Sequence, residues 1–230
     1  MKKTKLGVCL LLVSVIMSAC VPDPEPVGEK RFSVLGDSYS TYRGYVDPES
    51  NDVWGYYDTL GVNSVEKMWW YQLGEIMGWT LEKNNSFSGS LICNLNYNNY
   101  YGAHSFLRRM DDLGDPDIIL VFGGTNDMWD HVPMGDYVYW GWTDEELCTF
   151  RPALARLFDG LHERYPEADL VFMADTDLGE EFVETAHTIA DYYGVQCVDL
   201  VGIQKTWKHP SVEGMATIAS QMAAALREEF

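Results

Sequence analysis

The chain has 230 residues, of which 47% are hydrophobic, and its formal net charge is −19 at pH 7. So acidic a protein is a poor partner for nucleic acid or for an anionic membrane surface, and neither is expected as a ligand. About 200 residues follow the N-terminal segment, which is enough for one domain with a full core.

Residues 1–19 have the pattern of a secretory signal peptide. Three lysines precede the apolar run Leu6–Met17, which is too short to cross a bilayer comfortably, and small residues then lead to Cys20. The segment from Met17 to Cys20 resembles a bacterial lipobox, which implies cleavage before Cys20 and attachment of lipid to its thiol. We therefore expect an exported protein, anchored by lipid to a bacterial membrane, at the outer membrane or the cell surface.

Residues 20–30 predict an extended tether, because three prolines stand at alternate positions. The domain then covers residues 31–230. Loss of the signal peptide removes three lysines and no acids, so the charge becomes −22. Three cysteines remain in the domain, and an odd number implies no disulfide framework.

Apolar, β-rich runs alternate with helical patterns through the domain. The predicted strands are Arg31–Leu35, Thr80–Asn84, Asp117–Phe122, Asp169–Ala174 and Val195–Leu200. The predicted helices are Val65–Met77, Asp144–Tyr165, Glu180–Tyr193 and Val212–Glu228. Such alternation predicts an α/β fold, with a five-stranded parallel sheet covered by helices on both faces.

Two further local patterns stand out. Thr143 with Glu146 three residues on predicts a capping box at the start of the second helix. The aromatic and glycine-rich segment 42–63 is a long insertion after the first strand, and such insertions usually shape an active site.

Polar motifs fall at the carboxyl ends of three predicted strands and before the last helix. They are Gly36-Asp37-Ser38, residues 84–90, residues 123–127 and Lys208-His209-Pro210-Ser211. Since the carboxyl ends of parallel strands share one edge of a sheet, we expect these motifs to meet there. The polar residues after Ser38 predict a helix start, whose N-terminus would stabilise negative charge.

These residue types are the ones that acyl transfer requires. A serine hydroxyl needs a base to take its proton, and histidine is the base suited to neutral pH. The oxyanion of the tetrahedral intermediate needs preorganised donors, which a glycine backbone N–H and an asparagine amide can supply. Ser38, His209, Gly89 and Asn126 offer these groups.

The four motifs together resemble those of the SGNH (GDSL-type) hydrolase superfamily, over essentially the whole domain from Phe32 onward. The resemblance implies a three-layer α/β/α flavodoxin-like fold, with Ser38 as nucleophile and His209 as general base. It also implies an oxyanion hole made by the backbone N–H groups of Ser38 and Gly89 and the side chain of Asn126.

One position departs from the family pattern. Thr206 stands three residues before His209, where the family has the aspartate that orients the imidazole. Three explanations remain open: a Ser-His dyad oriented by a backbone carbonyl, a replacement acid, or loss of activity. Glu213, one helical turn beyond His209, and Asp199, at the end of the last strand, are the replacement acids considered.

Several residues near the motifs are candidates for substrate contacts. His131 follows the Asn126 motif closely, and Trp129, Trp140 and Trp142 could form a platform on which sugars stack. Trp54 belongs to the same aromatic group. Neither a metal motif nor a nucleotide-binding motif is present, so we expect catalysis without a cofactor.

The sequence predicts a serine esterase that hydrolyses an ester bond, that of an acetyl group on a carbohydrate, through an acyl-enzyme intermediate. One alternative is a lipase or thioesterase. Another, from a different class, is a glycan-binding lipoprotein that kept the fold and lost activity. A flavodoxin-like cofactor binder is a third.

Overall fold

A five-stranded parallel sheet forms the centre of the domain, as the sequence predicts. The computed structural model describes residues 30–46, 61–94 and 102–227, and within them the strand order is β2-β1-β3-β4-β5. The strands are β1 (Arg31–Gly36), β2 (Thr80–Ser86), β3 (Ile118–Phe122), β4 (Asp169–Asp175) and β5 (Gln196–Leu200). All four pairings are parallel, so the carboxyl ends of the strands lie at one edge.

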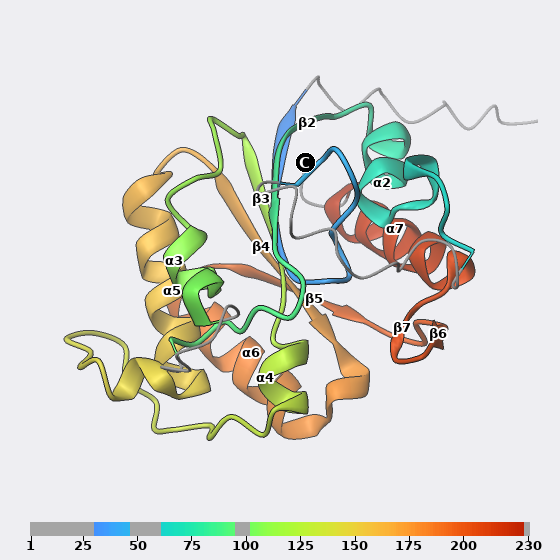
Figure 1. Cartoon of the computed structure of the whole chain (residues 1–230). Helices are drawn as coiled ribbons and strands as arrows, with labels where there is room; N and C mark the ends of the chain where they lie inside the picture. The colour runs from blue at the N-terminus through green and yellow to red at the C-terminus, as the bar shows by residue number, and fades with distance from the viewer. Residues whose placement is uncertain (1–29, 47–60, 95–101, 228–230) are drawn as a thin grey trace, which may run out of the picture.

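Helices cover both faces of this sheet (Figure 1). One layer contains α2 (Trp69–Met77) and α7 (Val212–Arg227), and the other contains α3 (Phe106–Arg109), α5 (Phe150–Arg164) and α6 (Glu180–Tyr193). The short α4 (Thr125–Trp129) follows β3, and single 3-10 turns are η2 (Val65–Lys67), η3 (Gly102–His104), η4 (Glu146–Cys148) and η5 (Thr176–Leu178). The predicted three-layer α/β/α architecture is therefore confirmed.

Strand side chains alternate between two hydrophobic cores. Val34 and Leu120 pack with the α2 and α7 layer, whereas Leu35 and Val121 pack with the α5 and α6 layer. Successive side chains of a strand point to opposite faces of the sheet, so strands buried on both sides need an unbroken apolar run. This is why the sequence indicated the central strands clearly.

The helix predicted from Asp144 begins later than expected. The capping box does form, since the Glu146 carboxylate accepts from the Thr143 backbone N–H and the Thr143 hydroxyl accepts from the Glu146 N–H. It caps only η4, because Thr149 is extended (φ −119°, ψ 155°) and ends that turn. The continuous helix α5 starts at Phe150.

The chain also turns, rather than entering a helix, directly after β1. Asp37 accepts a hydrogen bond from the Tyr39 backbone N–H at 2.9 Å through its side chain, and from the Ser40 N–H at 3.0 Å through its carbonyl. Aspartate readily bonds to the backbone two residues on, which favours a turn over a helix. No helix N-terminus therefore stands at Ser38.

A two-stranded hairpin precedes α7 and was not predicted. Its strands β6 (Lys205–Thr206) and β7 (His209–Pro210) pair antiparallel, with Thr206 opposite His209. Trp207 and Lys208 form the two-residue turn, and both have positive φ, 52° and 68°. Two successive left-handed residues match the turn that suits a short hairpin, although glycine and asparagine adopt it more easily.

Some predictions fall outside the described residues. These are the signal peptide, Cys20, the tether up to residue 29, Trp54 and most of the insertion after β1. Within the described part of the chain, no helix is both long and apolar enough to cross a membrane. The three cysteines of the described residues, Cys93, Cys148 and Cys197, form no disulfide.

Candidate active site

The Ser38 hydroxyl and the His209 imidazole lie side by side at the carboxyl edge of the sheet. Ser38 Oγ is 3.1 Å from His209 Nε2, although 171 positions separate the two residues in the sequence. Ser38 follows the end of β1 and is only 6% exposed, while His209 lies on β7 and is partly exposed. The structure thus brings the predicted nucleophile and base within hydrogen-bond distance.

The other imidazole nitrogen faces a backbone carbonyl. His209 Nδ1 is 3.1 Å from the carbonyl oxygen of Trp207, at the turn of the hairpin. Because a carbonyl oxygen can only accept, this contact requires the proton on Nδ1 and leaves Nε2 with a lone pair toward Ser38. Burial lowers the pKa of His209 below its ordinary value, while the bond to Trp207 acts in the opposite direction.

The two acids considered as replacements have other partners. Glu213 is exposed, and its carboxylate accepts from the Ser211 hydroxyl at 2.9 Å. Asp199 pairs with His187 at 2.8 Å, on the outermost strand of the sheet. Thr206, at the family's aspartate position, is exposed on β6. The partner described for His209 Nδ1 is the Trp207 carbonyl oxygen and not a carboxylate.

The end of β1 is shaped by a glycine and a buried acid. A Cβ on Gly36 would lie 2.7 Å from the hydroxyls of Ser40 and Ser86, so a larger residue does not fit there. Burial raises the pKa of Asp37 to about 7, against its bond from the Tyr39 N–H. Asp37 holds the turn that presents Ser38.

Asn126 lies in the first turn of α4 and reaches toward the same turn. Its amide nitrogen Nδ2 donates to the Ser90 carbonyl at 3.0 Å and, at a longer 3.3 Å, to Asp37 Oδ2. Gly89 precedes Ser90 and has φ 76°, a conformation that a residue with a side chain rarely adopts. The predicted oxyanion-hole residues therefore come from three neighbouring segments, which are the turn after β1, the loop after β2 and the first turn of α4.

Asp127 fixes the loop after β2. Its carboxylate accepts from the backbone N–H groups of Ile92, at 2.9 Å, and Cys93, at 3.2 Å. Burial raises its pKa to about 6, and those bonds lower it. Asp127 thus ties the loop that follows Gly89 to the first turn of α4.

One of the four candidate substrate-binding residues contacts the site. Trp129 packs edge-on against His209, with ring centres 5.9 Å apart, and Lys208 Nζ lies 4.9 Å from the centre of its ring. His131 is exposed just beyond α4, and its backbone bonds to Met128. Trp140 is 71% exposed.

Trp142 packs elsewhere. Its indole donates to the Val138 carbonyl at 2.7 Å, the Arg156 guanidinium lies 5.7 Å from the centre of its ring, and the side chain lies against the core beneath α5. None of the contacts described for Trp140 or Trp142 joins them to Ser38 or His209.

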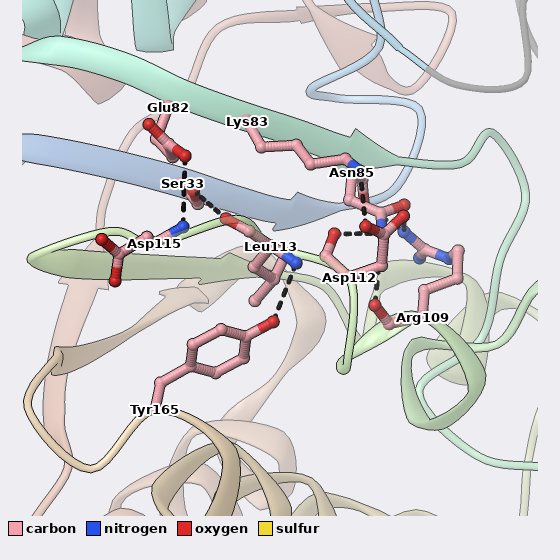
Figure 2. A network of polar contacts seen from close by, with 9 residues as sticks. All are labelled: Ser33, Glu82, Lys83, Asn85, Arg109, Asp112, Leu113, Asp115 and Tyr165. Atoms are coloured by element: carbon pink, nitrogen blue, oxygen red, sulfur yellow. Dashed lines mark hydrogen bonds and ion pairs between the residues drawn. The ribbon is translucent and has the colours of Figure 1, made fainter.

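Arg109, a buried residue of α3, was missed by the sequence analysis. Its guanidinium donates to the carbonyls of Gly36 and Asn85 and to the Ser90 hydroxyl. Figure 2 shows it beside Asn85, at the end of β2. Burial lowers its pKa to about 9, and the charge of Asp37 acts in the opposite direction. Arg109 thus joins the end of β1, just before Ser38, to the end of β2 and to Ser90 in the loop that follows β2.

The hairpin that carries His209 is anchored through Lys205 and Tyr39, whose contacts were also missed. Lys205 Nζ lies 2.7 Å from the buried carboxylate of Asp175 at the end of β4, and 2.8 Å from Asp177. The Tyr39 hydroxyl donates to the Lys208 carbonyl at 2.6 Å. Tyr39 and Lys208 are the neighbours of Ser38 and His209, so this bond helps to set the spacing of the Ser38 and His209 side chains.

Comparison with known proteins gives a consistent picture. Residues 30–226 match the model of the family described as GDSL-like Lipase/Acylhydrolase. A candidate GDSL-like lipase from Bacteroides ovatus is 43% identical, with a TM-score of 0.82 over 87% of this chain and 99% of its own. A second, from Bacteroides uniformis, is 42% identical with a TM-score of 0.82 over 87% and 97%.

More distant structures share the fold. A family two carbohydrate esterase from Clostridium thermocellum, solved with cellohexaose, is 16% identical, with a TM-score of 0.57 over 91% of this chain and 66% of its own. No curated protein matches the chain.

Proposed function

Because the chain belongs to the GDSL-like lipase/acylhydrolase family, we propose that it is a serine esterase with Ser38 as nucleophile and His209 as general base. The observation that supports this most directly is the hydrogen-bonded line from Ser38 Oγ through the imidazole to the Trp207 carbonyl. A nucleophile, its base and a group that orients the base are the three parts that activate a serine.

The reaction begins with attack of Ser38 Oγ on the ester carbonyl, while His209 Nε2 takes the hydroxyl proton. The imidazolium then gives that proton to the leaving alcohol, and an acyl-enzyme remains on Ser38. Water, deprotonated by the same nitrogen, attacks the acyl-enzyme and releases the acid. The Trp207 carbonyl keeps the imidazole oriented in both steps, and as a dipole it stabilises the imidazolium less than a carboxylate would.

The oxyanion would be held by the backbone N–H groups of Ser38 and Gly89 and by the Asn126 amide. Asn126 Nδ2 has two hydrogens, of which one is engaged by the Ser90 carbonyl at 3.0 Å. Its longer bond, 3.3 Å to Asp37, is the one that the oxyanion would replace.

We propose an acetyl group on a carbohydrate as the substrate ester. Trp207 is 84% exposed at the turn beside His209, and Trp129 packs against the imidazole. The exposed indole of Trp207 and the partly buried indole of Trp129 each offer a flat face that suits the apolar faces of sugar rings. The family two carbohydrate esterase that shares this fold was solved with cellohexaose, and a carbohydrate substrate for this chain agrees with that likeness.

Export and a lipid anchor at Cys20 belong to the same proposal, and they rest on the sequence of residues 1–20 alone. Radiolabelled palmitate supplied to cells that produce the protein should be incorporated into the wild type and not into Cys20→Ala. Equal incorporation into the two proteins would contradict the anchor.

The esterase activity is tested by labelling with a fluorophosphonate and by turnover of p-nitrophenyl acetate. Wild-type protein should be labelled on Ser38 and should turn over the ester, and Ser38→Ala should do neither. Ser211→Ala is the matched control, because Ser211 lies close to His209 in the sequence and bonds to Glu213.

The control should keep both activities. If the wild type is not labelled and shows no turnover that depends on Ser38, the serine esterase is excluded and the glycan-binding alternative is favoured.

A further inference from the structure

Three different metal-binding side chains meet on the surface between α6 and β5. They are the imidazole of His187, the thiol of Cys197 and the carboxylate of Asp199, whose ligand atoms all lie within 4.8 Å of one another. None of them takes part in the proposed reaction, which is centred on β1 and the hairpin.

The fold, rather than a local motif, brings these residues together. Cys197 and Asp199 are two positions apart on β5, so their side chains point to the same face of the sheet. Their partners in β4, Phe172 and Ala174, belong to the core under α5 and α6, which identifies that face. His187 projects toward it from the middle of α6.

We propose that His187, Cys197 and Asp199 bind one divalent transition-metal ion, with Zn²⁺ as the best fit. Zinc in proteins is held by cysteine sulfur, histidine nitrogen and carboxylate oxygen, usually four in number. A thiol and an imidazole are poor ligands for Mg²⁺ and Ca²⁺, which prefer oxygen. With three protein ligands, the fourth position would be taken by water.

The present geometry needs only a small adjustment to hold the ion. His187 Nε2 and Asp199 Oδ1 are 2.8 Å apart and hydrogen-bonded. Two ligands of a tetrahedral zinc stand roughly 3.3–3.5 Å apart, given bonds of about 2.0–2.3 Å. The two side chains are 40% and 43% exposed, so both can move and the ion can enter from solvent.

Protons and charges balance on binding. The Cys197 Sγ–H bond breaks, its proton passes to solvent, and the thiolate, the neutral imidazole and the carboxylate bind the cation. Burial first, and then the charges of Asp199 and Asp191, raise the pKa of the Cys197 thiol, so the bound cation must drive its deprotonation.

The ion would act as a clamp rather than as a catalyst. β5 is the last strand of the sheet order, so it has a hydrogen-bonded neighbour, β4, on one side only within the described chain. A metal that joins β5 to α6 binds the folded state and not the unfolded one, so the free energy of unfolding rises with the logarithm of the metal concentration relative to its Kd.

Titration of the purified protein with Co²⁺ tests this site, because a thiolate ligand gives a charge-transfer absorption that oxygen and nitrogen ligands do not. Wild-type protein should bind one Co²⁺ with that absorption, and added Zn²⁺, but not Mg²⁺ or Ca²⁺, should remove it. Cys197→Ser should lose the charge-transfer band, and His187→Gln should bind at least about tenfold more weakly.

Cys148→Ser is the matched control, because Cys148 is another partly exposed thiol, and it should titrate like the wild type. Circular dichroism checks that each variant is folded. A wild-type titration without thiolate absorption, or one unchanged in Cys197→Ser, would overturn the proposal. Turnover of p-nitrophenyl acetate should be equal with and without Zn²⁺, so this result is independent of the esterase test.

Discussion

The Nδ1 atom of His209 lies 3.1 Å from the carbonyl oxygen of Trp207, two residues earlier in the chain. The contact lies within the turn of the β6–β7 hairpin, where Trp207 and Lys208 both have a left-handed backbone conformation. Left-handed backbone costs roughly 1–2 kcal/mol for each residue that has a side chain. The left-handed turn therefore lowers the stability of the hairpin, and it also directs the Trp207 carbonyl toward the His209 imidazole.

The first prediction concerns the acids near this imidazole. Since Glu213 bonds to Ser211 and Asp199 to His187, Glu213→Gln and Asp199→Asn should keep kcat/KM for p-nitrophenyl acetate within about threefold of the wild type. His209→Ala should lower it by about 10⁴-fold or more. A loss of several orders of magnitude in either acid variant would identify that acid as part of the catalytic machinery.

The second prediction is a pH profile. Burial lowers the pKa of His209, and only the neutral imidazole can act as base. On lowering the pH, kcat/KM should therefore persist below the ordinary histidine pKa of about 6.5 before it falls.

The lowered pKa of His209 also makes the stability of the folded chain depend on pH. The unfolded chain takes up the proton on this histidine at a higher pH than the folded chain, so its contribution to stability is present above about 6.5 and is lost as the pH falls through the lower folded value. An acidic limb of kcat/KM centred above 6.5 would contradict the assignment of His209 as a buried neutral base.

The third prediction tests Arg109. Lysine keeps the charge but cannot donate at once to Gly36, Asn85 and Ser90, so Arg109→Lys should leave buried carbonyls unsatisfied. We expect a loss of about 2–4 kcal/mol in the free energy of unfolding, measured in urea, and a fall in kcat larger than any rise in KM. Arg108→Lys, on the exposed face of α3, is the control and should change neither quantity.

The fourth prediction tests the anchor of the hairpin. Lys205→Gln removes the cation that faces the buried carboxylate of Asp175, and breaking a buried pair from one side costs about 3–5 kcal/mol. Because the hairpin carries His209, fluorophosphonate labelling of Ser38 should slow as well. Asp177→Asn removes only the exposed partner and should have a much smaller effect on both measurements.

The fifth prediction separates the substrate from the chemistry. Trp207→Asn keeps a residue suited to the left-handed turn and keeps the backbone carbonyl, but removes the exposed indole. Turnover of p-nitrophenyl acetate should change by less than about threefold, while kcat/KM for an acetylated oligosaccharide should fall at least about tenfold, or about 1.4 kcal/mol. Equal losses on both substrates would show that the ring does not bind the sugar.

Much of this fold could be predicted from the sequence, and the reasons are physical. The central strands β1, β3 and β4 are buried on both faces and need apolar runs such as 118–122. α6 has an amphipathic pattern, and Gly194 follows its last residue, Tyr193, in the left-handed conformation. The hairpin of β6 and β7 has only two residues in each strand, too few for a period to show.

The parts of the site that were missed depend on the backbone. Arg109 is a single arginine whose acceptors include main-chain carbonyls from two strand ends, and neither carbonyl has a sequence signature. The same is true of Trp207, whose main-chain oxygen faces His209 Nδ1. Sequence could indicate that an acid was absent at position 206, but not what stands in its place.

The separation of 171 positions between Ser38 and His209 also has a consequence in time. Ser38 follows the first strand of the sheet and His209 lies in the hairpin before the last helix, so the proposed nucleophile and base do not come together until both ends of the domain have folded. The recovery of Ser38 reactivity during refolding would therefore report the closing of the whole sheet, from β1 to the hairpin, rather than the folding of any one part.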